Sequence, residues 1–289
     1  MTSLQLRQGS AVATIALRGA EPLSWQVGGR ELVWHGDPAY WSGRAPILFP
    51  VVGASVGGEV RVDGESYPMP QHGFARGLDF AVVSRGEHTA HLRLGDSPDT
   101  RQHYPFAFRL DVVATLSESE LRFDYEVDNP GSVDLPYALG FHPAFPWPFM
   151  AGDNKGYRVE FEAAEEPFVP TIREMGILDR APRPVPLEGR NLDLAPELFA
   201  EGAMVFREAR SRVMRFVAPS GEAIEMAVED FPHLALWTRP TAPFLSLEAW
   251  TGHADWAGFS GELRERNTIR LLAPGSSARH AVTLSWREA

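Results

Sequence analysis

Two histidines and one glutamate stand in unusually apolar or rigid surroundings, and their side chains could move protons. His142 lies in LGFHPAFPW, where Pro143 and Pro146 fix the backbone and no residue is charged. His72 stands beside a glycine in PMPQHGFARGLDF, and Glu248 interrupts the apolar run PFLSLEAW. Burial raises the pKa of a carboxyl group and makes it a stronger base. The three side chains are therefore a candidate set for a reaction that only transfers protons.

Each of these side chains also has a purely structural interpretation. His142 could be a buried histidine whose ring bonds a backbone carbonyl. Glu248 could simply face solvent on an edge strand, although Leu247, Ala249 and Trp250 flank it. The residue types alone do not separate the two interpretations, so the choice depends on the elements that position them.

Alternating apolar and polar residues recur along the chain and predict half-buried strands. In LRFDYEVDNPG, for example, apolar side chains from Leu121 to Val127 alternate with charged ones, and a turn sequence follows. Helical periodicity is confined to short turns near residues 100 and 195. Strands that follow strands predict antiparallel sheets packed face to face, an all-β fold. The other predicted strands cover residues 11–17, 23–27, 80–84, 92–94, 106–114, 157–161, 213–217, 223–228 and 281–286.

The length of 289 residues suits one large all-β domain, and we expect residues 1–289 to form a single β-sandwich. Residues 163–196 are rich in proline and show little alternation. We therefore predict a long excursion over the surface. Loops of that length are unusual unless they cover a site.

The composition argues against several classes of partner. Asp and Glu outnumber Lys and Arg by 38 to 27, which gives a net charge of −11, so nucleic acid and anionic membranes are poor partners. The absence of cysteine excludes disulfides and thiolate zinc sites. No signal peptide or membrane-spanning run is recognisable. We expect a cytoplasmic protein, monomeric or homodimeric, that acts on a small molecule.

Three segments, HGFAR, GFHPAF and FLSLEAWTG, occur in this order and resemble the signature segments of the aldose 1-epimerase (galactose mutarotase) family. The resemblance is strongest to the bacterial LacX-like branch, and RAPILFPVVG and HYPFAFRLDV extend it over most of the chain. It implies a large antiparallel β-sandwich of the galactose mutarotase type, with a monosaccharide lying across one open sheet. It also implies an isomerase that requires neither a metal nor a cofactor.

The resemblance also implies a role for each matching residue. Glu248 would be the general base that removes the proton of the anomeric hydroxyl. His142 would be the general acid that protonates the ring oxygen, and His72 would hydrogen-bond the same region and stabilise the developing charge. Arg44 and Arg76 would bind sugar hydroxyls.

The chain departs from the family pattern at two positions next to these residues. Ala144 stands where many relatives carry tyrosine, which could widen the site, and Ala249 stands where proline often follows the glutamate. Trp237, in LALWTRP, could stack on a sugar face, although a tryptophan in a strand is more often part of a core. These departures bear on the sugar preference rather than on the type of reaction.

Four alternatives remain open at this stage. Two histidines and a carboxylate also describe a facial metal triad, but such ligands usually include two close in sequence, and His88 and His91 would face opposite ways on a strand. A glycosidase would need a second carboxylate facing Glu248, for which Asp255 is one candidate. A non-catalytic sugar-binding protein has no use for a rigidly held histidine. A hexose-6-phosphate 1-epimerase would use Arg44 and Arg76 to bind a phosphate.

Overall fold

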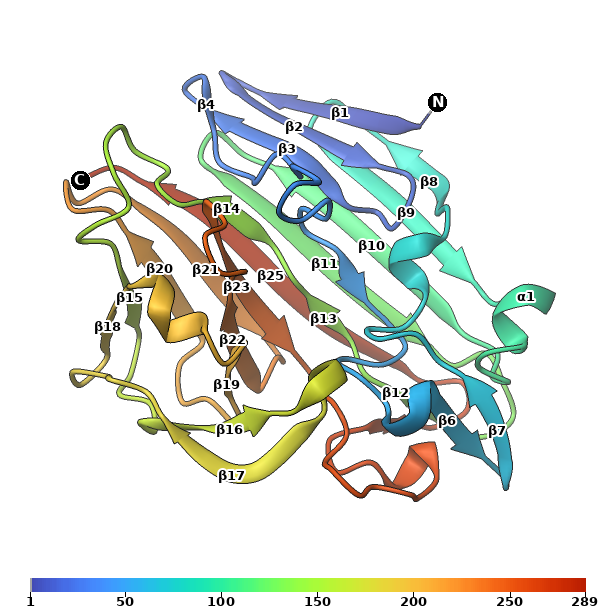
Figure 1. The fold of residues 1–289 in the computed structure, drawn as a ribbon. Coiled ribbons are helices and arrows are strands. Elements are labelled where there is room, and N and C mark those ends of the chain that lie inside the picture. Colours follow the sequence, from blue (N-terminus) through green and yellow to red (C-terminus); the bar gives the residue numbers. More distant parts are fainter. Residues whose placement is uncertain (1) are drawn as a thin grey trace.

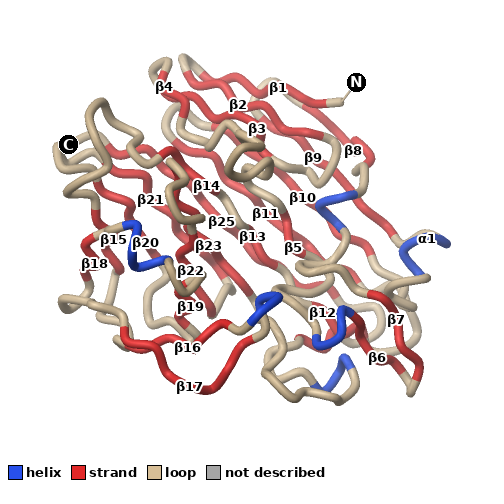
Figure 2. The backbone as a smooth tube through the Cα atoms, in the orientation of Figure 1, coloured by secondary structure: helices blue, strands red, loops and turns tan. Residues whose placement is uncertain are grey.

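Strands are the main regular structure in the computed structural model, which describes residues 2–289, and loops and short helical turns connect them (Figure 2). The first four strands form a small antiparallel sheet in sequence order, which lies beside β8 and β9 in Figure 1. These strands are β1 (Ser3–Gln8), β2 (Ala11–Ala16), β3 (Pro22–Val27) and β4 (Arg30–Glu31).

A nine-stranded antiparallel sheet forms one layer of the molecule (Figure 1). Its order is β18-β15-β20-β21-β25-β11-β10-β9-β8. The strands are β8 (Ala81–Arg85), β9 (Thr89–Gly95), β10 (Arg109–Leu116), β11 (Glu120–Asp128), β15 (Arg158–Phe161), β18 (Asn191–Asp193), β20 (Val213–Val217), β21 (Ala223–Glu229) and β25 (Ser277–Arg287).

A six-stranded antiparallel sheet forms the facing layer. Five of its strands run in the order β19-β22-β23-β13-β5, and β14 also pairs with β23. The strands are β5 (Ile47–Leu48), β13 (Gly140–Phe141), β14 (Ala144–Pro146), β19 (Met204–Phe206), β22 (His233–Trp237) and β23 (Phe244–Trp250).

Three strand pairs and six short helical turns complete the fold. The pairs are β6 (Glu59–Val62) with β7 (Glu65–Pro68), β12 (Leu135–Tyr137) with β24 (Arg270–Leu272), and β16 (Phe168–Ile172) with β17 (Leu178–Pro184). The turns are α1 (Pro98–Arg101), η1 (Val56–Gly58), η2 (Ala75–Gly77), η3 (Glu174–Gly176), η4 (Pro196–Phe199) and η5 (Leu263–Glu265). No helix among residues 2–289 has the length and apolar character needed to cross a bilayer.

The two large sheets share one apolar core, which confirms the predicted β-sandwich. Phe123 and Tyr125 of β11 are buried, whereas Asp124 between them is partly exposed. The ring of Phe123 lies 5.0 Å from the ring of Phe141, which comes from the six-stranded sheet. Full burial of such a side chain stabilises the fold by about 1.5–3 kcal/mol. Leu247 and Ala249 of β23 join the same core, so Glu248 between them points to the opposite face of the six-stranded sheet.

The prediction of an irregular surface excursion over residues 163–196 was wrong in part. The segment forms the hairpin β16–β17, with η3 at its tip, followed by the short strand β18. Pro170 and Pro182 are register partners in this hairpin, and the register shifts after Pro170. Proline is tolerated because each strand of a two-stranded ribbon has a free edge that needs no N–H donor. The same prolines break the sequence alternation by which strands are recognised.

Candidate active site

Strand register brings His142 and Glu248 together. β13 and β14 both pair with β23, and the two residues between them leave His142 directly across from Glu248. The flanking register partners are Phe141 with Ala249 and Ala144 with Ser246. Residues that face each other across antiparallel strands share one face of the sheet. As a result, His142 Nε2 lies 3.2 Å from Glu248 Oε1.

The carboxyl group of Glu248 is enclosed by protein. Only 1% of the residue is exposed, which excludes the interpretation of a solvent-facing edge position. Trp250 Nε1 donates a hydrogen bond to Oε2 at 3.1 Å, and Oε1 faces His142. Burial raises the pKa of Glu248 well above its usual value, and the bond from Trp250 opposes this shift only in part. Burial therefore favours the protonated form of this carboxyl group.

His142 is buried too, and its ring is enclosed mainly by aromatic side chains. Burial, assisted by the positive charge of Arg76, lowers the pKa of His142 to about 3. Nδ1 of His142 has no hydrogen-bond partner of regular geometry among residues 2–289, and only the backbone carbonyl of His142 itself opposes the shift of its pKa. Burial thus favours the neutral form of both groups in this contact, the carboxylic acid of Glu248 and the imidazole of His142.

His72 reaches the same region from a strained turn. Both His72 and Gly73 have positive φ angles, of 67° and 71°. A side chain at Gly73 would place its Cβ 2.1 Å from the carbonyl oxygen of Phe49, so only glycine fits there. The backbone N–H of Gly53 donates to His72 Nδ1 at 3.1 Å, which leaves Nε2 to carry the ring proton. The His72 and His142 rings lie 5.9 Å apart.

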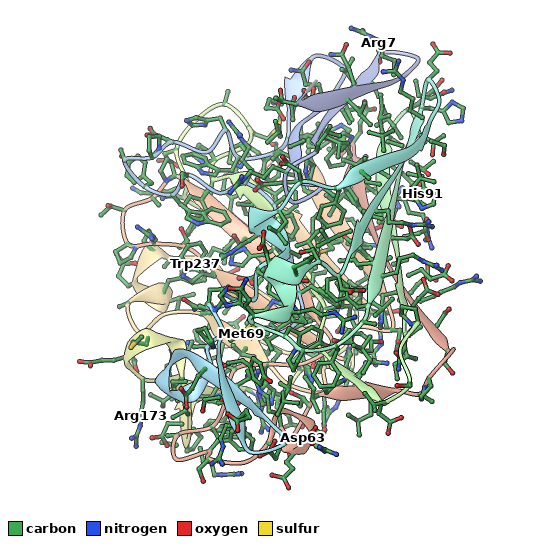
Figure 3. All side chains as sticks on the ribbon, turned by 90° about the vertical axis from the view of Figure 1, so that its right-hand side faces the viewer. Arg7, Asp63, Met69, His91, Arg173 and Trp237 are labelled. Carbon is green, nitrogen blue, oxygen red and sulfur yellow. The ribbon has the colours of Figure 1, made fainter. Side chains whose placement is uncertain are left out.

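A cavity of about 320 Å³ connects these side chains on the outer face of the six-stranded sheet. The hairpin β16–β17 and its tip form one wall of the cavity through Ile172, Gly176 and Leu178. The excursion that was expected to cover a site therefore does border this cavity. Trp237 on β22 lines it as well, on the side of the molecule opposite His91 of the nine-stranded sheet (Figure 3).

Five of the six site residues predicted from the sequence border this one cavity. They are His72, Arg76, His142, Trp237 and Glu248. The sixth, Arg44, lies outside the lining, and its Nε donates to the carbonyl oxygen of His35 at 2.9 Å. The prediction that Arg44 binds a sugar hydroxyl finds no support in this position.

Two further cavity residues were missed by the sequence reasoning. Trp41 packs its ring 5.1 Å from the ring of His142, and Arg239 lines the rim. Arg239 could have been found, because it follows Trp237 by two positions and strand alternation would put both on one face. Trp41 carried no comparable signal, since it lies in a segment without alternation, shortly before RAPILFPVVG.

The residues of the alternative sites have structural partners instead. Asp255, the candidate second carboxylate, lies 2.6 Å from Arg266 Nε and accepts the backbone N–H of Val56 at 2.9 Å. His88 is exposed, and His91 lies 2.7 Å from Asp111. In the part of the chain that the structure describes, no group of three or more His, Cys, Asp or Glu side chains is arranged to hold a metal ion.

The sequence matches a known protein family over most of its length. The sequence model of the aldose 1-epimerases matches residues 2–264. The chain belongs to the aldose 1-epimerase family. Protein LacX of Lactococcus lactis subsp. lactis is 33% identical over 78% of this chain and 79% of its own length.

Solved structures of this family share the same fold. A galactose mutarotase-like protein from Lactobacillus casei superimposes with a TM-score of 0.92 at 29% identity and covers 99% of this chain and 100% of its own. A galactose mutarotase related enzyme from Lactobacillus acidophilus also has a TM-score of 0.92, at 24% identity, with 99% and 97% of the chains covered. The expected galactose mutarotase-type sandwich of the aldose 1-epimerases is thereby confirmed.

Proposed function

We propose that this protein is an aldose 1-epimerase that interconverts the α and β anomers of a hexose. The observation that carries the proposal is the 3.2 Å contact between His142 Nε2 and Glu248 Oε1 at the wall of a sugar-sized cavity. Opening a cyclic hemiacetal requires one proton to be removed and another to be delivered. An imidazole and a carboxyl group side by side can do both, and membership of the aldose 1-epimerase family supports this type of reaction.

The reaction proceeds in two mirrored halves. Glu248 as carboxylate takes the proton of the anomeric hydroxyl, and His142 as imidazolium gives a proton to the ring oxygen. The bond between C1 and the ring oxygen breaks and leaves an open-chain aldehyde. After rotation about the C1–C2 bond, the C5 hydroxyl attacks the other face of the carbonyl. His142 removes the proton of that hydroxyl and Glu248 returns its proton to the former carbonyl oxygen, so the enzyme regains its starting state.

The starting state differs from the unliganded one by the position of one proton. Burial favours the acid form of Glu248 and the neutral form of His142, whereas ring opening needs the proton on the imidazole. Transfer across the contact between them provides that state without exchange with solvent. The indole N–H of Trp250 stabilises the carboxylate that results, and His72 offers Nε2–H to the charge that develops on the substrate.

Polarimetry on freshly dissolved α-D-glucose and α-D-galactose tests the proposal. The protein is expected to accelerate the approach to the equilibrium rotation, and Glu248→Gln is expected to abolish the acceleration while leaving binding largely intact. Equal rates with and without protein over a range of aldoses would instead indicate a carbohydrate-binding protein of this fold.

A hexose 6-phosphate is the second candidate substrate, and two arginines favour it. Arg76 and Arg239 both line the cavity, and neither forms an ion pair with a carboxylate among residues 2–289. The Nη2 atom of Arg76 donates to the backbone oxygen of Gln71 at 2.8 Å. Guanidinium groups bind phosphate strongly and often bidentately. Rates with glucose and glucose 6-phosphate, compared under the same conditions, decide between the two substrates.

A further inference from the structure

The imidazole of His142 is oriented without the hydrogen bond that usually orients a catalytic histidine. In most such sites the ring nitrogen that does not face the substrate bonds a carboxylate or carbonyl, which fixes the orientation of the ring. Nδ1 of His142 has no such partner on any other described residue, and only the carbonyl of His142 itself acts on the ring, without regular hydrogen-bond geometry. Something other than a hydrogen bond at Nδ1 must therefore keep Nε2 directed at Glu248.

Two indole rings contact the imidazole instead. The ring of Trp41 lies 5.1 Å from the His142 ring at an interplanar angle of 35°, so the two rings are tilted against each other. The ring of Trp237 lies 5.3 Å from the His142 ring at 82° and meets it edge to face. The two indoles also contact each other, at 5.3 Å and 82°. Rotation of the imidazole would require one of these rings to move.

Trp41 is itself held in place by the segment that carries it. The backbone N–H of Trp41 donates to the carbonyl oxygen of Asp37 at 2.8 Å, and its own carbonyl accepts the indole N–H of Trp34 at 2.9 Å. A Cβ atom at Gly43 would lie 2.6 Å from Cζ2 of Trp41, so the indole occupies space that a side chain at Gly43 would fill. Phe244 supports the indole at a ring distance of 5.5 Å.

We propose that Trp41 is a positioning residue, whose indole holds the His142 imidazole in the orientation that transfers protons to and from Glu248 and the sugar. This inference rests on the proposed function. It assigns to an aromatic ring the task that a hydrogen bond at Nδ1 performs elsewhere. It also differs from sugar stacking, because the indole acts through His142 and would affect the chemical step.

Two titratable side chains and one charged side chain surround the His142 imidazole. Glu248 faces it from β23, His72 faces it from the turn before η2, and Arg76 on η2 acts on it through its charge. If the indole of Trp41 is removed, the imidazole can rotate so that Nε2 no longer faces Glu248. A displacement of about 1 Å at a reacting group can cost roughly 100-fold in rate.

Steady-state kinetics on a set of variants test the proposal. Trp41→Ala is expected to lower kcat by about 10-fold to 100-fold, with little change in KM, and Trp41→Phe to restore most of it. Gly43→Ala, which crowds the indole without touching His142, is expected to change kcat in the same direction. Tyr40→Ala is the matched control, because Tyr40 lies in the same segment and contacts Trp34 but not His142. A rise in KM at unchanged kcat in Trp41→Ala would identify a sugar platform and overturn the proposal.

Nitrogen NMR of the His142 imidazole provides a readout that does not depend on turnover. The wild-type protein and Trp41→Phe are expected to show one fixed tautomer, whereas Trp41→Ala shows averaged nitrogen shifts. Unchanged shifts in Trp41→Ala overturn the proposal. If the wild-type protein accelerates no aldose, the proposed function fails, but the NMR comparison still decides the positioning role. Should Trp41→Ala not fold, Trp41→Leu and Gly43→Ala allow the same comparison.

Discussion

Trp250 donates its indole N–H to Oε2 of Glu248, its neighbour two positions away on the same face of β23, at 3.1 Å. With Oε1 against His142, both carboxyl oxygens are engaged and the group has one orientation. A proton acceptor that is fixed before the substrate arrives loses no entropy when the reaction begins. Because alternate residues of a strand share one face, β23 itself places Trp250 where its indole can fix the carboxyl group that the proposed reaction uses.

Glu248→Gln is expected to lower kcat for mutarotation by about 100-fold to 10,000-fold, because the amide cannot take up the anomeric proton. The amide oxygen still accepts the Trp250 N–H, so the fold should persist. Polarimetry gives the rate, and thermal unfolding of the same sample shows whether the variant is folded. A folded variant with wild-type kcat would remove Glu248 from the mechanism.

Gly73→Ala is expected to destabilise the protein by about 3 kcal/mol or more, because the new Cβ overlaps the Phe49 backbone at a positive φ. Gly64→Ala is the matched control, since Gly64 also has a positive φ, of 86°, but nothing lies within 4 Å of the added atom. That variant should lose only about 1 kcal/mol. Urea unfolding measures both free energies, and equal losses would show that crowding at Phe49 is not the cause.

Much of the sandwich could be predicted because its strands are half-buried. The alternation from Leu121 to Val127 reproduces β11, and the runs at 213–217 and 223–228 match β20 and β21 within one residue. The turn expected near residue 100 is α1, where the Ser97 side chain accepts the Thr100 N–H. Each of these features depends on local chemistry that the sequence displays directly.

The parts that could not be predicted depend on contacts between distant segments. No local pattern specifies that β14 pairs with β23, and so the contact between His142 and Glu248 could be expected only from the family resemblance. Ala144, which could widen the site where relatives carry tyrosine, packs in a buried cluster with Trp34 and Phe244.

Acid conditions are expected to destabilise the protein through a pair of buried histidines. Burial, with nearby positive charge, lowers the pKa of His253 to about 4 and that of His233 to about 3. In the unfolded chain both groups titrate near 6.5, so between that pH and about 4 the unfolded state binds more protons. The free energy of unfolding should therefore be greatest above pH 6.5 and fall on acidification. For His253 the shift corresponds to about 3 kcal/mol, as an order of magnitude.

Urea unfolding between pH 4 and 7 measures this dependence. His253→Asn is expected to flatten the slope of stability against pH, whatever its effect on stability at neutral pH. His88→Asn serves as the control, because it removes an exposed histidine instead of a buried one. Parallel slopes for the wild-type protein and His253→Asn would assign the acid sensitivity to other groups.

Arg239→Gln discriminates between neutral and phosphorylated sugars. Arg239 lines the cavity without an ion-pair partner among residues 2–289. No carboxylate in the described part of the chain neutralises its guanidinium, so its positive charge is available to a phosphate. If the substrate is a hexose 6-phosphate, KM for that sugar should rise by about 10-fold, because a charge-assisted hydrogen bond contributes about 1.5 kcal/mol or more. KM for glucose should stay unchanged, and Arg239→Lys should retain part of the affinity because it keeps the charge but loses the bidentate geometry. Parallel rises for both sugars would instead assign Arg239 to a hydroxyl group that the two share.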